Sequence, residues 1–228
     1  MNEPLSRRCL AEFFSTFCLV LLGCGAMAVD SRTGALTHVG VAIAWGLVVM
    51  VMIYAVGGVS GAHMNPAVTI AFATQKRLPI RDTLGYVPAQ CLGALCGALA
   101  IRAVLGLDQS MLGATSVQLE LSPIVGMVIE FFLSAILMFV VMGVSTGAKE
   151  ETITAGIAVG ATIALEAMVA GPLTKASMNP ARSFGPAVAS GDVSELWIYI
   201  IGPIAGTIVG AIASQVLRAN EHRVTKQS

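Results

Sequence analysis

Charge is scarce in this chain, and neither sign is in excess. Charged residues make up 11% of the 228 residues, with 13 Lys and Arg against 13 Asp and Glu. A sequence without a basic run or an acidic tail gives no indication of a nucleic acid partner. Hydrophobic residues make up 56% and the mean hydropathy is +0.82, so a soluble domain would lack the polar surface to cover itself. The composition predicts an integral membrane protein whose partner is the lipid bilayer.

The sequence also lacks the residue combinations that are typical of enzyme active sites and metal sites. No Ser-His-Asp set, His or Cys cluster, or phosphate-binding loop is visible, so we expect no enzyme, no cofactor and no metal site. The cysteines lie in apolar stretches, without the spacing of a disulfide framework or a zinc site. This placement indicates that they are small core residues. They are Cys9, Cys18, Cys24, Cys91 and Cys96.

Six stretches are long and apolar enough to cross a bilayer. About 20 apolar residues rising 1.5 Å each span a hydrocarbon core of about 30 Å. The predicted spans cover residues 9–29, 38–56, 84–101, 121–144, 152–170 and 196–217. The charges inside them are Glu12, Glu130 and Glu166. The sequence thus predicts an all-α membrane protein with six transmembrane helices, in a single domain over residues 1–228.

The N-terminus allows one alternative, a cleavable signal peptide. Arg7 and Arg8 precede an apolar run that reaches Ala26-Met27-Ala28, the pattern of a cleavage site. Glu12 interrupts that run, and its Glu-Phe-Phe sequence recurs at Glu130, deep in the chain. We therefore expect the first stretch to be a structural span.

The chain repeats itself. Asn65-Pro66-Ala67 recurs as Asn179-Pro180-Ala181, half the chain length away, and the pair Gly93 and Gly97 recurs as Gly206 and Gly210. Each repeat, approximately 1–110 and 118–217, holds three spans, so the second must be inverted relative to the first. The spaced glycines predict close helix contacts at equivalent places.

Each Asn-Pro-Ala motif predicts the start of a short helix inside apolar territory, because Asn caps helices and Pro suits their first position. Residues 66–75 and 180–189 would each reach about 15 Å, half of the core thickness. Their N-termini are then expected to meet near the midplane. Non-helical backbone at that depth should line a water-filled path. The expected lining residues are Gly61, Ala62, His63, Met64, Lys175, Ser177 and Met178.

Such a path would select by charge. Two positive helix ends facing one point oppose any cation, including a proton moving along water. The amides of Asn65 and Asn179 can donate hydrogen bonds to a passing oxygen atom. We expect small, uncharged, hydroxyl-rich solutes to pass.

Lys and Arg predict the orientation. With the N-terminus in the cytoplasm, nine of the 13 face inward, and both termini are then cytoplasmic. These nine are Arg7, Arg8, Lys76, Arg77, Arg81, Lys149, Arg218, Arg223 and Lys226.

The segments Ser60–Thr69 and Gly171–Ser183 resemble the two signature loops of the major intrinsic protein family, the aquaporins and aquaglyceroporins. The resemblance implies six helices plus two re-entrant half-helices in a right-handed bundle, a homotetramer with one pore per protomer, and passive conduction. Glu12 and Glu130 match the buried glutamates that brace the re-entrant loops. The family's selectivity constriction maps to Trp45, Ala167, Ala176 and Arg182.

These positions indicate the solute range. Water-selective members usually carry His where this chain has Ala167, so a wider opening beside Trp45 is expected. Ser183 replaces the Asp usual in glycerol facilitators. The combination is similar to the nodulin-like intrinsic protein (NIP) subgroup and its bacterial relatives, which implies a bacterial or archaeal plasma membrane and passage of water, glycerol and neutral hydroxides such as arsenous acid.

Other functions stay open at this point. A mainly water-selective pore, or one for ammonia or urea, fits the same motifs. A coupled secondary transporter also uses inverted repeats and broken helices, and Glu166 is its candidate coupling residue. Facing inward, Glu166 would hold Lys175 or a loop amide, and facing the lumen it would be an acceptor. Lys175 would exclude cations or, as we favour, extend outward. We expect His63 to stabilise its loop rather than to act as a pH gate.

Overall fold

A computed structural model of the chain describes residues 3–106, 112–145 and 149–218, without the side chains of residues 149–153. These residues form eight helices and no strand. The helices are α1 (Leu5–Thr33), α2 (Thr37–Ser60), α3 (Pro66–Thr74), α4 (Ile80–Leu105), α5 (Pro123–Val144), α6 (Lys149–Thr174), α7 (Pro180–Ser190) and α8 (Ile198–Arg218). Six of them are long and apolar enough to cross a membrane, all but α3 and α7. This confirms the predicted all-α membrane fold. The Lys149 side chain, Arg223 and Lys226 lie outside the described residues.

The spanning helices mostly run further than the apolar stretches that predict them. Helix α1 begins at Leu5 rather than at residue 9 and ends at Thr33. Several helices end where a glycine takes a left-handed conformation, with φ of 64° at Gly34, 89° at Gly61 and 58° at Gly106. Such a glycine cap stops a helix wherever it occurs in the sequence. The helix end is therefore set by the cap, while the end of the apolar run marks only the edge of the bilayer.

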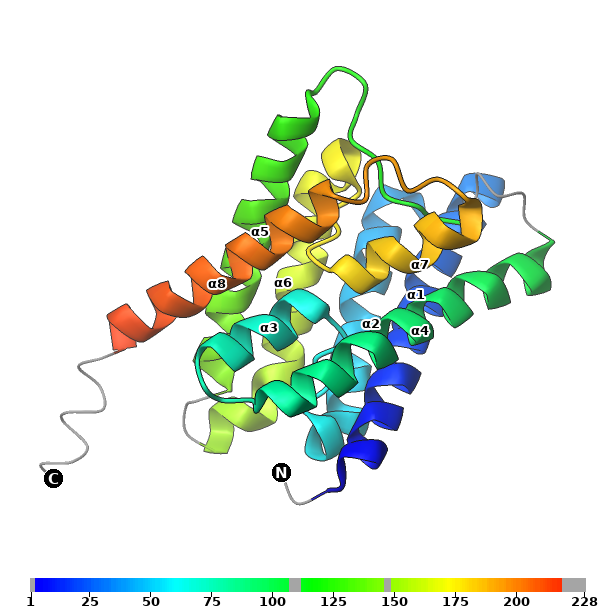
Figure 1. Cartoon of the computed structure of the whole chain (residues 1–228). Coiled ribbons are helices and arrows are strands. Elements are labelled where there is room, and N and C mark those ends of the chain that lie inside the picture. The colour runs from blue at the N-terminus through cyan, green and yellow to red at the C-terminus, as the bar shows by residue number, and fades with distance from the viewer. Residues whose placement is uncertain (1–2, 107–111, 146–148, 219–228) are drawn as a thin grey trace, which may run out of the picture.

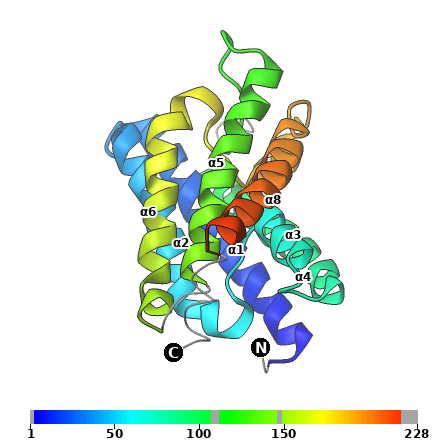
Figure 2. The same cartoon turned by 90° about the vertical axis from the view of Figure 1, so that its left-hand side faces the viewer.

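The helices pack in equivalent pairs in the two halves of the chain. Helix α1 packs against α4, and α5 packs against α8, and Figures 1 and 2 show these pairs from two sides. A Cβ added to Gly93 would lie 2.2 Å from the Phe13 carbonyl oxygen, and one added to Gly206 would lie 2.1 Å from that of Phe131. The repeated glycines thus allow the same close approach of backbones in both pairs.

Helices α2 and α6 cross through a reciprocal contact. A Cβ on Gly46 would lie 2.3 Å from the Gly160 carbonyl oxygen, and one on Gly160 would lie 2.6 Å from that of Gly46. A contact in which each residue meets the other's backbone is what a two-fold relation between the halves produces.

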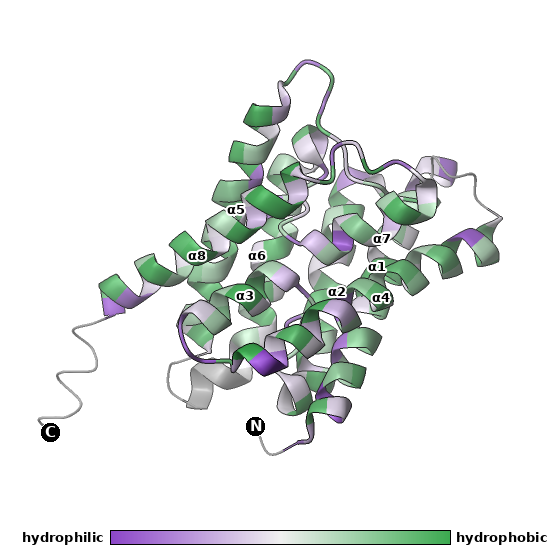
Figure 3. Cartoon of the chain, in the orientation of Figure 1, coloured by the Kyte–Doolittle hydropathy of each residue, from purple (hydrophilic) through white to green (hydrophobic). Residues whose placement is uncertain are grey.

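The outer surface is apolar, while several polar side chains are buried. Figure 3 shows that hydrophobic residues predominate along the spanning helices. Large side chains such as Leu84, Val104 and Val216 are exposed, whereas Glu12 and Glu130 are buried. An apolar exterior is what a helical bundle presents to lipid tails, and buried charges in such a bundle mark its functional interior.

Candidate functional site

The two short helices begin inside the bundle, each behind a capping asparagine. Helix α3 starts at Pro66, and the Asn65 Oδ1 accepts a hydrogen bond from the Ala67 amide at 2.9 Å. Helix α7 starts at Pro180, and the Asn179 Oδ1 accepts from the Ala181 amide at 3.0 Å. The starts are the predicted ones, and each end differs by one residue from the expected range. Cap chemistry is local in sequence, which explains this accuracy.

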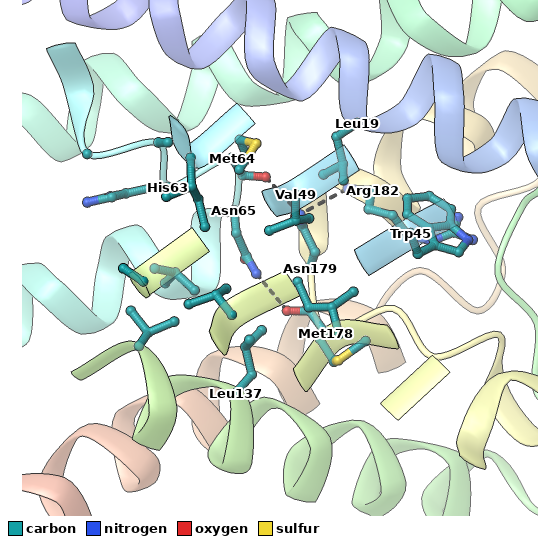
Figure 4. Close-up of a pocket in the computed structure, with 18 of the residues that line it drawn as sticks. Leu19, Trp45, Val49, His63, Met64, Asn65, Leu137, Met178, Asn179 and Arg182 are labelled. Atoms are coloured by element: carbon teal, nitrogen blue, oxygen red, sulfur yellow. Dashed lines mark hydrogen bonds between the residues drawn. The ribbon is translucent and has the colours of Figure 1, made fainter. Parts of the chain in front are cut away.

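The same two asparagines fasten the halves of the chain together. The Asn65 Nδ2 donates to the Met178 carbonyl oxygen at 2.8 Å, and the Asn179 Nδ2 donates to that of Met64 at the same distance. Figure 4 shows this pair of crossed bonds at the centre of the cavity. An amide NH2 group carries two protons, so each asparagine has a second N–H besides the one in this crossed bond.

Glu12 lies behind the first loop and accepts hydrogen bonds from its backbone. Its carboxylate accepts from the amides of His63 at 2.9 Å and Met64 at 2.7 Å, and from the Ser60 hydroxyl at 2.6 Å. The side chain of Gln90, on α4, donates to the same carboxylate at 2.7 Å. A buried carboxylate is stable where several donors replace its water, and these four do so.

Glu130 makes the matching set of bonds behind the second loop. It accepts from the amides of Ser177 at 2.9 Å and Met178 at 2.7 Å, and from the Thr174 hydroxyl at 2.7 Å. Glu12 and Glu130 therefore bind the loop backbone in the same way, at the two residues that precede the capping asparagine of each half.

The loop backbones take unusual conformations at the same places. In the first loop Gly61, Ala62 and Met64 have φ of 89°, 49° and 51°. The second loop follows this pattern, with positive φ at Lys175, Ala176 and Met178. A non-glycine residue in this region costs roughly 1–2 kcal/mol, so something must hold it there. The carboxylate bonds to the loop amides are that constraint.

Residues for which the sequence predicted no role at the loops complete the loop supports. The Tyr86 hydroxyl donates to the Ser60 carbonyl oxygen at 2.8 Å, and the Tyr199 hydroxyl donates to that of Thr174 at 3.0 Å. The pairing of these tyrosines in the repeat was a usable signal. Gln90 has no such partner in the other half, and a lone glutamine in an apolar span was its only mark.

A cavity of about 140 Å³ runs between the loops and the long helices. It brings together all four predicted constriction residues with both asparagines and most of the predicted loop residues. The predicted residues that line it are Trp45, Gly61, Ala62, His63, Met64, Asn65, Ala167, Ala176, Ser177, Met178, Asn179 and Arg182. The lining does not include Lys175, Glu12, Glu130 or the Pro and Ala residues of the motifs.

The rest of the cavity wall is apolar apart from Ser145 and was not predicted. Most of its side chains come from strongly hydrophobic helices, so the sequence alone does not tell the inward face from the lipid face. They include Leu19, Val49, Ile53, Val68, Phe72, Leu137, Val141, Val144, Val159 and Ile163. Such a wall offers few hydrogen bonds, so the polar contacts for a small molecule gather at the loops and at Arg182.

Arg182 is buried and held on several sides. Its Nη1 donates to the Gly113 carbonyl oxygen at 2.7 Å, and its Nη2 lies 3.3 Å from the Met27 sulfur. The guanidinium carbon lies 4.5 Å from the centroid of the Trp45 ring. A cation over an aromatic face is attracted to it, so the two side chains fix each other's position.

The surroundings of Glu166, Lys175 and His63 differ in burial and in polar contacts. Glu166 is buried, does not line the cavity, and neither carboxyl oxygen has a hydrogen-bond partner among the described residues. Lys175 is exposed and lines outer surface hollows, with no ion pair to Glu166 in the described part of the chain. The His63 ring stacks on Phe72 with centroids 4.8 Å apart, and its Nδ1 lies 3.1 Å from the Thr69 hydroxyl.

The described residues contain no group of three or more His, Cys, Asp or Glu side chains placed to hold a metal ion.

The chain is similar to known membrane channel proteins along most of its length. The family model described as Major intrinsic protein matches residues 2–214. Aquaporin NIP1-1 of Oryza sativa subsp. japonica is 46% identical over 218 residues, covering 95% of this chain and 76% of that protein. Aquaporin NIP1-2 of Arabidopsis thaliana is 42% identical over 224 residues, covering 96% and 76%. The expected similarity to the NIP subgroup is confirmed.

A solved structure is similar along nearly the whole chain. The X-ray structure of the aquaglyceroporin from Plasmodium falciparum has a TM-score of 0.79 and 25% sequence identity, and the match covers 92% of this chain and 95% of that one.

Proposed function

The chain belongs to the major intrinsic protein family, whose members are membrane channels for water and small solutes and not enzymes, and we propose that its pore conducts glycerol and neutral hydroxides as well as water. Arsenous acid in its undissociated form is a proposed solute of this kind. The proposed constriction is formed by Trp45, Ala167, Ala176 and Arg182. The relatives named above support the channel class, and the solute range rests on the geometry of these four residues.

The observation that carries the proposal is that small and large groups line the same cavity. Ala167 and Ala176 take up little space, while Trp45 presents an apolar face and Arg182 presents a fixed donor. A polyol has a carbon edge and a hydroxyl edge, and the two kinds of wall suit them. A charged solute would have to lose its hydration shell beside Arg182 and the positive ends of two helices, each of about +0.5 elementary charge.

The two asparagines extend this selection to the centre of the membrane. Each already donates one N–H to the opposite loop, and we propose that the second N–H donates to a passing oxygen atom. A water held by both donors points its own protons away from them, which interrupts the chain along which a proton would hop.

The test is a flux comparison with one substitution in the constriction. Ala167→His places a larger, polar ring in the lining of the same cavity as Arg182, so glycerol should be excluded more strongly than water. We expect glycerol permeability to fall by about tenfold or more, in the range that one misfitting group is worth in a fitted site, and water permeability to fall less. Stopped-flow light scattering on proteoliposomes measures both.

Val169→His is the matched control for this test. It lies two residues further along α6 with an exposed side chain, so it adds the same ring outside the cavity and should leave both fluxes unchanged. Equal loss of water and glycerol flux in Ala167→His, or no loss, would contradict the proposed constriction. A wild-type protein that passes water but not glycerol would favour the water-selective alternative, and a flux that collapses with the proton gradient would favour a coupled transporter.

Three expectations about the assembled protein are part of the proposal. We infer a homotetramer from the family resemblance, cytoplasmic termini from the distribution of Lys and Arg, and a bacterial or archaeal plasma membrane from the resemblance to bacterial members. The relatives named above are plant proteins and lend no support to the last of these. Chemical crosslinking in membranes measures the first, and a four-band ladder is the expected result.

A further inference from the structure

Trp45 rests directly on the backbone of α1, at Gly23. A Cβ added to Gly23 would lie 2.3 Å from Cζ3, 2.4 Å from Cε3 and 2.5 Å from Cη2 of the Trp45 ring. No other side chain fits there without moving the ring. Gly23 lies inside a helix and its φ is not positive, so glycine is needed at this place for space and not for backbone conformation.

The same ring forms part of the proposed constriction. Trp45 lines the cavity and stacks against the Arg182 guanidinium. The indole therefore packs against Gly23 of α1, lines the cavity and contacts Arg182. The depth to which it settles toward α1 determines how much of the opening remains.

The next residues of α1 support Arg182 in the same way. The Cys24 sulfur lies 3.7 Å from the Arg182 Nη1, and the Met27 sulfur lies 3.3 Å from the Nη2. Helix α1 supplies none of the four constriction residues, yet one short segment of it backs two of them.

We propose that Gly23 is a specificity-determining residue of this channel, because the missing side chain lets Trp45 recede from the pore. The proposal rests on the constriction proposed above. A methyl group at Gly23 pushes the indole away from α1 and narrows the opening from the side of Trp45, without replacing any residue that a solute touches.

Gly23→Ala tests this by flux, with Gly25→Ala as the matched control. Glycerol permeability should fall about tenfold in Gly23→Ala, at the lower end of what one misplaced methylene costs in a fitted site, and water permeability should fall less. Gly25 lies on the same helix, and a Cβ there would meet nothing within 4 Å, so both fluxes should stay at the wild-type level. Unchanged glycerol flux in a folded Gly23→Ala protein overturns the proposal.

A second variant separates the ring from the rest of the packing. The three clashing atoms belong to the six-membered ring of the indole. With Ala at position 23, that ring would overlap the added methyl group. Trp45→Phe shortens the ring, so adding Gly23→Ala to it should change glycerol flux little relative to Trp45→Phe alone. If Gly23→Ala alone does not fold, the double variant should fold. Failure of both to fold would overturn the proposal, because the clash would then be with α1 packing and not with Trp45.

A third measurement does not depend on any solute. The chain has two tryptophans, so Trp197→Phe leaves Trp45 as the sole indole fluorophore. In that background Gly23→Ala should make Trp45 more accessible to acrylamide, with a larger quenching constant, and Gly25→Ala should not. If wild-type protein passed no glycerol, the proposed solute range would fail, and the quenching and water flux would still decide the role of Gly23. An unchanged quenching constant would contradict it.

Discussion

At the scale of single residues, two buried glutamates that look alike in the sequence have opposite surroundings. Glu130 accepts three hydrogen bonds from its loop, and Glu166 has no partner among the described residues. A buried carboxylate without donors or a counterion is strongly disfavoured, so the neutral acid is the expected form of Glu166. The two side chains should therefore respond differently to replacement by the neutral amide of Gln.

Glu130→Gln replaces an acceptor oxygen with an NH2 group that faces amide donors. It should lower the free energy of unfolding by about 1–3 kcal/mol, the usual cost of an unsatisfied buried group. Glu166→Gln keeps the shape of an already neutral side chain, and its effect should stay within about 0.5 kcal/mol. Thermal unfolding in detergent, followed by circular dichroism, measures the difference. An equal loss of unfolding free energy in both variants would mean that the Glu166 carboxyl group has a hydrogen-bond partner in the folded protein after all.

How well a site residue could be predicted depends on whether its signal is local. Asn65, Asn179 and Arg182 lie in motifs that can be read within a few positions, and the structure brings them to one cavity. Leu19 and Gly23 touch that cavity or its wall through contacts between α1 and distant helices. Nothing in the local sequence of an apolar span distinguishes such a residue from a lipid-facing neighbour.

At the scale of helices, existence was easier to predict than length. Each predicted span is present, because 20 apolar residues have one stable use in a membrane. The ends were missed by several residues in α1 and α4, since glycine caps and the polar interface lie beyond the apolar run. The half-helices were placed more accurately than the long ones, because their starts depend on a capping residue rather than on hydropathy.

The glycine contact between α5 and α8 gives a prediction at this scale. Gly206→Ala would place a Cβ 2.1 Å from the Phe131 carbonyl oxygen, so the two helices must separate. The expected cost is about 1–3 kcal/mol of unfolding free energy, typical of overpacking a close contact. Unfolding in a denaturing detergent measures it.

Gly58→Ala is the control for this prediction. Gly58 also lies inside a spanning helix, but an added Cβ there meets nothing within 4 Å, so stability should be unchanged or slightly raised. Equal destabilisation by both substitutions would show that the loss does not come from the α5–α8 contact.

At the scale of the whole molecule, the proposed orientation is testable from loops on opposite sides. With six spans and cytoplasmic termini, Arg81 lies on the inner side and Leu119 on the outer side, and both side chains are exposed. In a chain with its native cysteines replaced, an impermeant maleimide should label Leu119→Cys in intact cells. It should label Arg81→Cys only after the membrane is permeabilised. The reverse pattern would mean that the orientation is inverted.

The crossed bonds between Asn65 and Met178 and between Asn179 and Met64 have a consequence for how such a chain could arise. Each half offers one amide and one carbonyl oxygen to the other, so the contact has the form of a symmetric dimer interface in which residue i meets j and j meets i. A three-span ancestor able to insert in both directions could have assembled with an inverted copy of itself through this same contact. Gene fusion would then have joined the two subunits into one chain, with the former dimer interface inside its fold.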